Sequence, residues 1–294
     1  MKKYVNSLIA IMLVLGLLVG CGTNQPEQTA SKQQGETAVK EGEGNGLQKI
    51  KDRGKLIVGV KTDSPPFGYV NDKGEFVGFE VALARRFAKD LLGDESKIEL
   101  VSVTGPNRIP YLQSDKVDLI LATLSVSEER AKVIDFSNPY FKTAVQILTS
   151  KKSDIKSTKD LAGKKVVVVK GSVADLYLTK NVPTAELIKF EKNTEALQAL
   201  KDGRAEAYFQ DNVVIYSWAR ENPDFHVLPE QIEPTPWAGG VKKGNKELND
   251  WINSELEALG KEQFLHKLYD EYLKKEFGPE INPDDIVVEG GKLK

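Results

Sequence analysis

From Leu47 onwards, short runs of branched or aromatic residues alternate with longer amphipathic stretches. This alternation is the pattern of an α/β fold, because short apolar runs form buried strands and amphipathic stretches form the helices that cover them. β-Branched and aromatic side chains also pack well on a pleated surface. The strands predicted in this way are residues 56–60, 98–102, 118–122, 144–148, 165–169 and 205–209.

Amphipathic stretches between and after these runs predict the helices. One helix is predicted from four apolar residues spaced four apart, which make a single stripe: Phe79, Leu83, Phe87 and Leu91. Thr194 is expected to cap a second helix over residues 195–202. Residues 247–277 predict one or two further helices, and Pro279 and Pro283 are expected to end regular structure.

The N-terminus has the pattern of a bacterial export signal. Lys2 and Lys3 precede an apolar run over residues 8–19, which is short for a spanning helix and typical of a signal peptide. The run ends in Leu-Val-Gly-Cys21, which resembles a lipobox, where cleavage leaves a lipidated cysteine. We therefore expect residues 1–20 to be removed, and Cys21 to anchor the protein to the membrane.

Residues 21–46 carry no large apolar side chain except Val39 and show no period, so they predict a disordered tether that ends where the folded module begins. The whole chain has 40 % hydrophobic and 29 % charged residues, which is ordinary for a globular protein. Removal of residues 1–20 changes the formal charge from −2 to −4, because Lys2 and Lys3 are lost. No basic field for nucleic acid is expected.

Sequence motifs of common enzymes are missing. His226 and His266 lie far apart without a cysteine partner, so a zinc site of ordinary spacing is not expected. The chain also lacks the glycine-rich phosphate loops and the nucleophile elbow. We expect no metal, no cofactor and no catalytic residue.

An ordered set of short motifs resembles the type II periplasmic substrate-binding proteins of polar amino-acid ABC transporters. Each motif is weak alone, but together they follow the family's order and spacing from about Gly54 to Phe277. The motifs lie at residues 54–60, 65–67, 78–80, 116–120, 127–130, 135–141, 159–163, 203–207 and 242–244.

The resemblance implies an α/β fold of two lobes joined by two crossover strands, with an amino acid bound between the lobes. It places the first lobe at residues 47–143 and 239–275, the second lobe at 144–238, and a C-terminal tail at 276–294. It further implies a monomeric, extracytoplasmic lipoprotein that delivers its ligand to an ABC permease. No reaction on the ligand is implied.

Arg130 is an unusual residue for the first turn of a helix, because a cation there opposes the helix dipole. Ser127 is a good N-cap for this helix. A guanidinium beside free backbone amides matches a carboxylate with two hydrogen bonds. The resemblance implies that Arg130 binds the α-carboxylate, together with the backbone amides of Thr123 and Ser125. The alternative is a surface arginine paired with a nearby carboxylate such as Asp135.

Asp211 follows a predicted strand at the tip where α/β proteins hold ligands, and the resemblance implies that it binds the α-ammonium. The alternative is an N-cap for the helix that starts at residue 212. Gly171 and Ser172 form a loop after another strand. Gly171 permits close approach of the backbone, and Ser172 can donate a hydrogen bond.

Arg108 and Lys61 are expected to decide which amino acid binds. The resemblance places both near the ligand side chain, and two cations with no evident carboxylate favour an acidic side chain, glutamate or aspartate. Relatives that bind glutamine carry a motif similar to the one around Arg108, so glutamine stays an alternative. Phe67, at a strand end, is expected to wall the ligand rather than fill the core.

Two other classes use the same fold. Dehydratase-type enzymes need a catalytic acid in the cleft, and sensor modules carry a transmembrane segment and an effector domain. Nothing after Phe277 is long or apolar enough for such a segment, so a transport function is preferred.

Overall fold

Residues 46–279 and 281–293 are described by a computed structural model of the chain, and every structural statement below concerns these residues. The predicted signal peptide, Cys21 and the predicted tether up to residue 45 lie outside them. The described residues belong to the compact unit Glu41–Lys294. Within them, no helix has the length and apolar character needed to cross a membrane.

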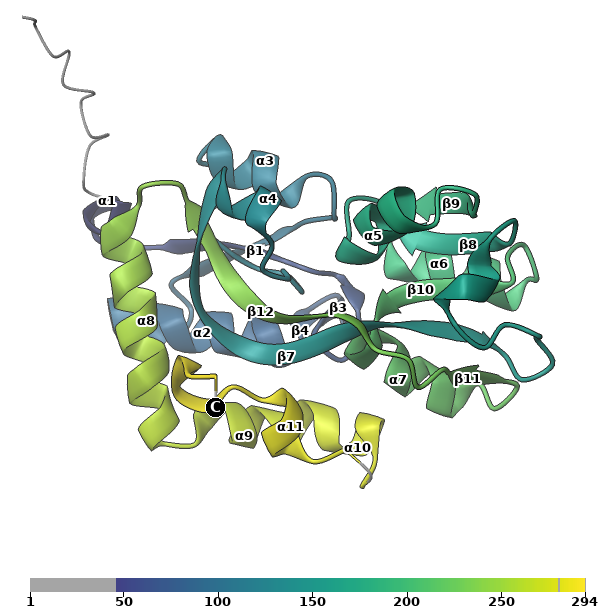
Figure 1. The fold of residues 1–294 in the computed structure, drawn as a ribbon. Coiled ribbons are helices and arrows are strands. Elements are labelled where there is room, and N and C mark those ends of the chain that lie inside the picture. Colours follow the sequence, from purple (N-terminus) through teal and green to yellow (C-terminus); the bar gives the residue numbers. More distant parts are fainter. Residues whose placement is uncertain (1–45, 280, 294) are drawn as a thin grey trace, which may run out of the picture. The chain divides into compact units, whose positions relative to one another are not determined.

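A long mixed sheet forms the centre of the described chain (Figure 1), in the order β5-β1-β6-β12-β7-β10-β8-β9 with β11 beside β7. Its strands are β1 (Leu56–Val60), β5 (Ile98–Ser102), β6 (Leu119–Leu121), β7 (Ile134–Ser150), β8 (Lys165–Val169), β9 (Glu186–Phe190), β10 (Ala207–Asp211), β11 (Phe225–Val227) and β12 (Ile232–Lys242). A small antiparallel sheet contains β2 (Asp63–Ser64), β3 (Gly68–Val70) and β4 (Phe76–Val77).

Two parallel groups of strands make up the long sheet. In the first, β1 pairs with β5 and β6; in the second, β8 pairs with β9 and β10. The long antiparallel strands β7 and β12 run between them, and β7 pairs first with β12 and then with β10 and β11. We call the group around β1, β5 and β6 the first lobe, and the group around β8, β9 and β10 the second lobe (Figure 1).

Helices cover the sheet in both lobes. The first lobe is covered by α1 (Gly46–Arg53), α2 (Phe79–Leu92), α3 (Arg108–Gln113), α4 (Glu128–Ala131), α8 (Lys246–Lys261), α9 (Phe264–Leu268), η2 (Tyr269–Leu273), α10 (Lys274–Phe277), α11 (Pro283–Ile286) and η3 (Glu289–Gly291). The second lobe is covered by η1 (Thr158–Leu161), α5 (Val173–Asn181), α6 (Asn193–Lys201) and α7 (Asn212–Glu221).

Apolar periodicity located the main elements correctly. The strands predicted at 56–60, 98–102 and 165–169 are confirmed, and the stripe on α2 buries Phe79, Leu83 and Phe87 completely. The prediction at 144–148 was too short, because β7 continues on both sides to pair with β12 and β11. Strand β10 begins two residues later than predicted, after the turn that follows α6.

Two predicted helix boundaries are wrong. Thr194 does not cap α6; the helix already includes Asn193, and Lys192 is its N-cap residue. Pro283 does not end regular structure but begins α11, because proline fits the first helical position, where no backbone N–H is needed.

The C-terminal segment packs onto the first lobe next to strand β7. The Val288 N–H donates to the Tyr140 carbonyl at 3.1 Å, and Val287 forms a bridge with Phe141. Val287 and Val288 are buried. The residues from 283 on therefore extend the first-lobe core over β7.

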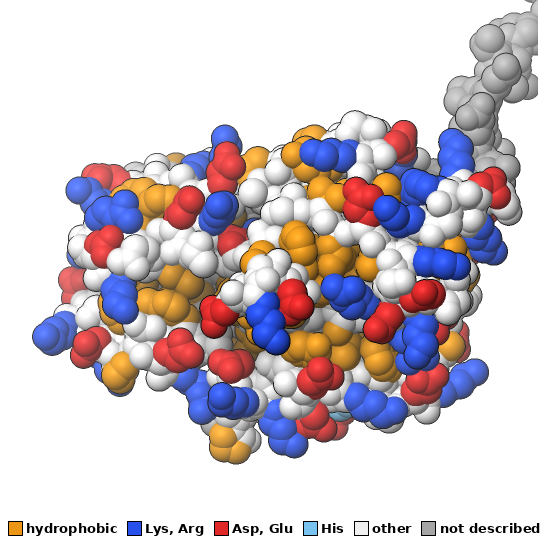
Figure 2. All heavy atoms as spheres, turned by 180° about the vertical axis from the view of Figure 1, so that it is seen from behind, with side chains coloured by type: hydrophobic (Ala, Val, Ile, Leu, Met, Phe, Trp, Pro, Cys, Tyr) orange, Lys and Arg blue, Asp and Glu red, His pale blue; other side chains and the backbone are white. Residues whose placement is uncertain are grey.

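Positive and negative side chains are mixed over the surface seen from behind (Figure 2). Hydrophobic side chains gather in the hollowed middle of that face. The mixture agrees with a formal net charge of only −2.

Candidate ligand-binding site

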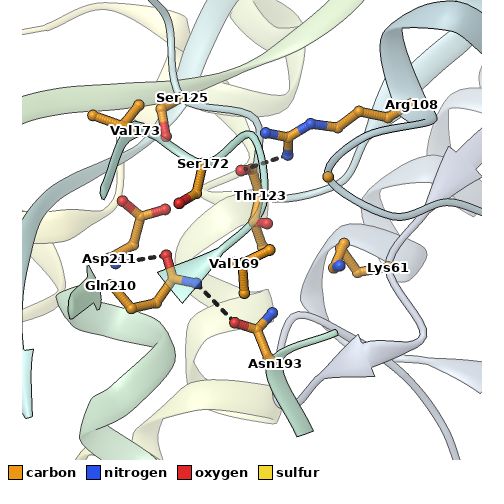
Figure 3. A pocket seen from close by; sticks show the side chains of 11 residues that line it. Lys61, Arg108, Thr123, Ser125, Val169, Ser172, Val173, Asn193, Gln210 and Asp211 are labelled. Carbon is orange, nitrogen blue, oxygen red and sulfur yellow. Dashed lines mark hydrogen bonds between the residues drawn. The ribbon is translucent and has the colours of Figure 1, made fainter. Parts of the chain in front are cut away.

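A polar cavity lies between the two lobes (Figure 3). The first lobe contributes residues from the ends of β1 and β6 and from the start of α3, and the second lobe contributes the ends of β8 and β10 with the residues that follow them. The lining residues are Lys61, Gly105, Arg108, Thr123, Ser125, Val169, Ser172, Val173, Asn193, Gln210 and Asp211. Such carboxyl-terminal strand ends are the usual ligand position in α/β sheets.

Asp211 ends β10 at the cavity, and its carboxylate is not used as a helix cap. It is the N-cap residue of α7, but its side chain accepts no hydrogen bond from that helix. Instead, Oδ2 accepts from the indole N–H of Trp237 at 3.2 Å. Burial raises the pKa of Asp211 to about 6, and the Trp237 hydrogen bond and the nearby Arg130 oppose this increase. The carboxylate is therefore a buried acceptor in need of a cation.

Arg130 lies beside the cavity wall and joins the two lobes. Ser127 caps α4 as predicted, accepting from the Arg130 N–H at 3.3 Å. The guanidinium donates to the carbonyl of Ser125 at 2.5 Å and to the carbonyl of Gly171 at 2.9 Å. Burial lowers the pKa of Arg130 to about 9, and Arg108 adds to this effect. Arg130 itself is not among the lining residues.

Arg108 begins α3 and extends its guanidinium to the cavity (Figure 3). Nη1 donates to the carbonyls of Ala122 and Thr123 at 2.7 and 3.1 Å, whereas Nε is buried without a partner. Burial also lowers the pKa of this group, against the attraction of Asp211 and Glu80. Arg108 therefore brings positive charge that carbonyl oxygens satisfy only in part.

Lys61 lines the cavity at the opposite side from Asp211 (Figure 3), and it is already paired. Its ammonium lies 2.8 Å from Oδ1 of Asp63, and both side chains are almost fully buried. Burial lowers the pKa of Lys61, while Asp63 raises it. An acidic ligand was expected because no carboxylate was expected near Lys61, and the position of Asp63 shows that the second expectation was wrong.

Asn193 and Gln210 also line the cavity, and sequence reasoning missed both as site residues. The Asn193 backbone N–H donates to Asp63 Oδ2 at 2.6 Å, and its side-chain amide donates to Ser64 at 2.6 Å. Its oxygen accepts from Tyr208 and Gln210 at 2.5 and 2.8 Å. Asn193 follows β9, so its place after a strand end was the signal that could have identified it.

Glu80 holds the loop that carries Thr123. Its Oε1 accepts from the Thr123 backbone N–H at 2.7 Å and from the Tyr140 hydroxyl at 2.5 Å, while Oε2 is buried without a partner. Burial raises the pKa of Glu80 to about 7. The Thr123 amide is therefore occupied, and the prediction that it binds a ligand carboxylate does not agree with this structure.

The loop containing Gly171 and Ser172 contacts the first lobe. Gly171 has a φ of 72°, which suits glycine, and its N–H donates to Asp175 at 2.9 Å. The Ser172 hydroxyl lines the cavity and caps α5 by accepting from the Asp175 N–H at 3.1 Å. Gly171 does not line the cavity, and its carbonyl accepts from Arg130.

Phe67 does not line the cavity, contrary to prediction. Its ring is completely buried in an aromatic cluster of the first lobe, edge-on to Phe79, Phe141 and Trp237 at centroid distances of 4.8 to 6.2 Å. Because the chain turns back after the two prolines, the ring points into the core rather than toward the ligand.

Among residues 46–279 and 281–293, no group of three or more histidine, cysteine or acidic side chains is placed to hold a metal ion. His266 does not line the cavity; its ring contacts Glu289 and Asp284 of the C-terminal segment.

Known proteins resemble this chain over most of its length. The ABC transporter glutamine-binding protein of Bacillus subtilis (strain 168) is 36 % identical over 94 % of this chain and 99 % of its own length. A glutamine-binding protein of Geobacillus stearothermophilus is 38 % identical, covering 83 % of this chain and 94 % of its own. Among solved structures, a cysteine-binding protein of Campylobacter jejuni superposes with a TM-score of 0.82 at 43 % identity, covering 83 % of this chain and 99 % of that one.

The fold is the α/β type II periplasmic binding protein fold, as the sequence predicted. The model of the family "Bacterial extracellular solute-binding proteins, family 3" matches residues 56–275. This range includes every residue that lines the cavity. The chain therefore belongs to family 3 of the bacterial extracellular solute-binding proteins, which are binding proteins rather than enzymes.

Proposed function

We propose that this protein is the amino-acid-binding component of an ABC importer and that its ligand is glutamine. One observation carries the proposal: a buried carboxylate, Asp211, and donors suited to a carboxylate meet at one side of a polar cavity between the lobes. An amino acid is the small solute that brings an ammonium and a carboxylate on the same carbon atom. The named function of the relatives supports this class of ligand.

In this arrangement Asp211 accepts the α-ammonium, because a buried carboxylate is stabilised by an opposite charge. The α-carboxylate lies by Ser125, Ser172 and Arg130. Ser125 and Trp237 face each other in a β-bridge whose hydrogen bonds are made by the residues on either side of them. Among the described residues, no acceptor binds the Ser125 N–H, so this donor is available to a ligand. On binding, Arg130 either donates to the ligand carboxylate the N–H that now binds the Gly171 carbonyl, or attracts the carboxylate by its positive charge from a position behind Ser125.

The ligand side chain then extends toward Lys61 and Asn193, on the side of the cavity away from Asp211 (Figure 3). This end carries a lysine that Asp63 already neutralises, together with the side-chain amides of Asn193 and Gln210. The Arg108 guanidinium, which also lines the cavity, donates to the carbonyls of Ala122 and Thr123. Such a lining suits an uncharged polar side chain. Relatives named for glutamate and aspartate are 25 % and 26 % identical, lower than those named for glutamine. Glutamine is therefore favoured over the acidic ligands that the sequence suggested.

We take the lobe boundaries as the sequence suggests them, at residues 143/144 and 238/239, within β7 and β12. Ligand capture then involves closure of one lobe on the other, and the ligand favours the closed form only as far as it contacts both. The Arg130 contact with Gly171 and the Asp63 contact with Asn193 are two hydrogen bonds that this closure makes.

Cys21 supplies the membrane anchor in this proposal, and residues 21–45 supply a tether to the extracytoplasmic binding module. The lipid holds the monomeric protein near the permease that receives the ligand. A lipidated cysteine gives attachment without a spanning helix. Mass spectrometry of the membrane-extracted protein tests the anchor, because a diacylated Cys21 at the mature N-terminus has a distinct mass.

Calorimetric titration of residues 22–294 against the twenty amino acids tests the ligand. Glutamine is expected to bind at least about tenfold more tightly than glutamate or aspartate, which corresponds to about 1.4 kcal/mol. Cysteine is included because of the Campylobacter jejuni relative. Tighter binding of an acidic amino acid, or of cysteine, contradicts glutamine as the ligand, and binding of none contradicts the amino-acid proposal.

A Gly105→Ala substitution tests closure. A Cβ atom at Gly105 meets the Lys170 carbonyl of the second lobe at 2.4 Å, which is closer than any real contact. Such overpacking costs about 1–3 kcal/mol, so glutamine affinity is expected to fall roughly tenfold to a hundredfold. Calorimetry measures the affinity. The melting temperature of the ligand-free variant serves as the control and is expected to fall little, because the clash involves the contact between lobes. Unchanged affinity argues against closure at this contact.

A further inference from the structure

Asp63 is placed between the cavity and the second lobe, and each of its carboxylate oxygens has a separate partner. Oδ1 lies 2.8 Å from the ammonium of Lys61, and Oδ2 accepts from the backbone N–H of Asn193 at 2.6 Å. Asp63 does not line the ligand cavity itself, whereas Lys61 and Asn193 both do. Asp63 therefore contacts the two residues that face the ligand side chain without facing the ligand.

The ion pair with Asp63 determines how much positive charge Lys61 presents to a ligand. An ammonium has three N–H donors, and the carboxylate uses one of them, so Lys61 can still donate to a ligand oxygen. The charge of Lys61 is balanced before the ligand arrives. A ligand carboxylate that approaches Lys61 meets an ammonium that is already paired and has to approach Asp63 in a buried site, which is unfavourable. A ligand amide meets a donor without this penalty.

We propose that Asp63, acting through Lys61, is the positioning residue that makes the site reject acidic side chains in favour of uncharged ones. The inference rests on the proposed amino-acid ligand and assigns its selectivity to a residue that the ligand does not touch. In this view, glutamine is chosen over glutamate because the lysine at the end of the cavity is neutralised by its own neighbour.

Other charged groups near Lys61 do not supply this balance. Arg108 and Glu80 both influence Lys61 electrostatically. The Arg108 guanidinium donates to two carbonyls, and Glu80 accepts from Thr123 and Tyr140. Only Asp63 forms an ion pair with Lys61 among the described residues.

The Asp63→Asn variant tests the inference with little change in shape. The asparagine oxygen can keep the hydrogen bond from the Asn193 N–H, and the amide nitrogen then faces Lys61, for which it is no acceptor. Lys61 becomes a buried cation that a ligand carboxylate can neutralise. The ratio of glutamate to glutamine affinity is expected to rise at least about tenfold over wild type.

Two companion variants make a cycle. Lys61→Gln leaves Asp63 without its cation, so the glutamate-to-glutamine ratio is expected to fall below the wild-type ratio. The double variant Lys61→Gln with Asp63→Asn removes both charges, and its ratio is expected to return toward wild type. If Asp63 and Lys61 had only a structural role, their variants would lower the glutamate and glutamine affinities together. The glutamate-to-glutamine ratio would then not rise in Asp63→Asn and fall in Lys61→Gln.

Asp135→Asn is the matched control. Asp135 pairs with Lys243 at 2.6 Å through one oxygen and accepts from the Gly244 N–H at 2.8 Å through the other, so the same two contacts are altered away from the cavity. Its affinity ratio is expected to equal that of wild type.

The outcomes separate the inference from the proposed function. Wild-type protein that binds no amino acid contradicts the function, whatever the variants do. Wild-type protein that binds, together with an unchanged ratio in Asp63→Asn, overturns the inference alone. If Asp63→Asn does not fold, the comparison of Lys61→Gln with the double variant decides, because these differ only at residue 63. Equal ratios in that pair also overturn the inference.

Discussion

An Arg130→Ala substitution is expected to weaken glutamine binding by at least about thirtyfold and to leave both lobes folded. Arg130 is 5 % exposed and joins the lobes through carbonyls on both sides of the cleft, Ser125 and Gly171. It also supplies positive charge at the end of the cavity where we place the α-carboxylate. Loss of one partner from a buried, hydrogen-bonded charge pair costs roughly 2–5 kcal/mol, and about 1.4 kcal/mol corresponds to a factor of ten.

The expected effect on stability is smaller than the effect on binding. Removing the guanidinium leaves two carbonyl oxygens to find water, which costs about 1–3 kcal/mol each when no water reaches them. It also removes a buried cation whose pKa burial has already lowered to about 9. These two effects oppose each other, so the melting temperature of the ligand-free protein is expected to change by a few degrees only.

Calorimetry of wild type, Arg130→Ala and Arg130→Lys separates charge from geometry. Lysine keeps the charge but has no planar fork, so its affinity is expected to lie between the other two. Arg86→Ala is the control, since Arg86 pairs with Asp90 and Glu262 on the surface of the first lobe. Affinity within a factor of about three of wild type in Arg130→Ala excludes Arg130 as the carboxylate partner.

Much of the fold could be predicted from the sequence because its information is local. A run such as residues 165–169, with four consecutive valines, predicts a strand buried on both faces within a parallel group of strands. The apolar stripe on α2 could be predicted because one face of the helix packs against the core, and residues spaced four apart share that face. Helix boundaries were harder to predict, since Asn193 and Thr194 are both favourable residues at a helix start.

The contacts that complete the site are not local, so the sequence could not predict them. Asn193 reaches Asp63 across 130 positions, and nothing in either segment indicates the other. Lys61 and Asp63 are only two positions apart, and the pair was missed because Lys61 was considered for its charge alone. Thr123 was expected to offer its amide to the ligand, but Glu80, from the first helix after the small sheet, accepts it.

Phe67 shows the limit of an argument from position in the chain. An aromatic residue after two prolines at a strand end suited a ligand wall, yet the same turn directs its ring into the core of the first lobe. There it meets Trp237 and Phe141, and Trp237 in turn donates to Asp211. The ring therefore affects the site only through the packing of β12.

A Phe67→Ala substitution is accordingly expected to lower the free energy of unfolding by about 4 kcal/mol, since replacing a core phenylalanine by alanine costs roughly 3–5 kcal/mol. Its edge-on contacts add to the loss, because such aromatic pairs contribute about 0.5–1.5 kcal/mol. In a chain of this size the melting temperature is expected to fall by about 10 °C. Thermal unfolding followed by circular dichroism measures the change.

Leu176→Ala is the control, because Leu176 is 47 % exposed on α5, and truncation there is expected to change stability by no more than about 0.5 kcal/mol. Glutamine affinity of Phe67→Ala, measured well below its melting temperature, decides between core and wall. A core residue leaves the affinity close to wild type, since no ligand contact is lost. A hundredfold loss of affinity with unchanged stability would mean that Phe67 contacts the ligand rather than the core. This outcome is not expected, because the closely packed aromatic cluster cannot lose the Phe67 ring without a loss of stability.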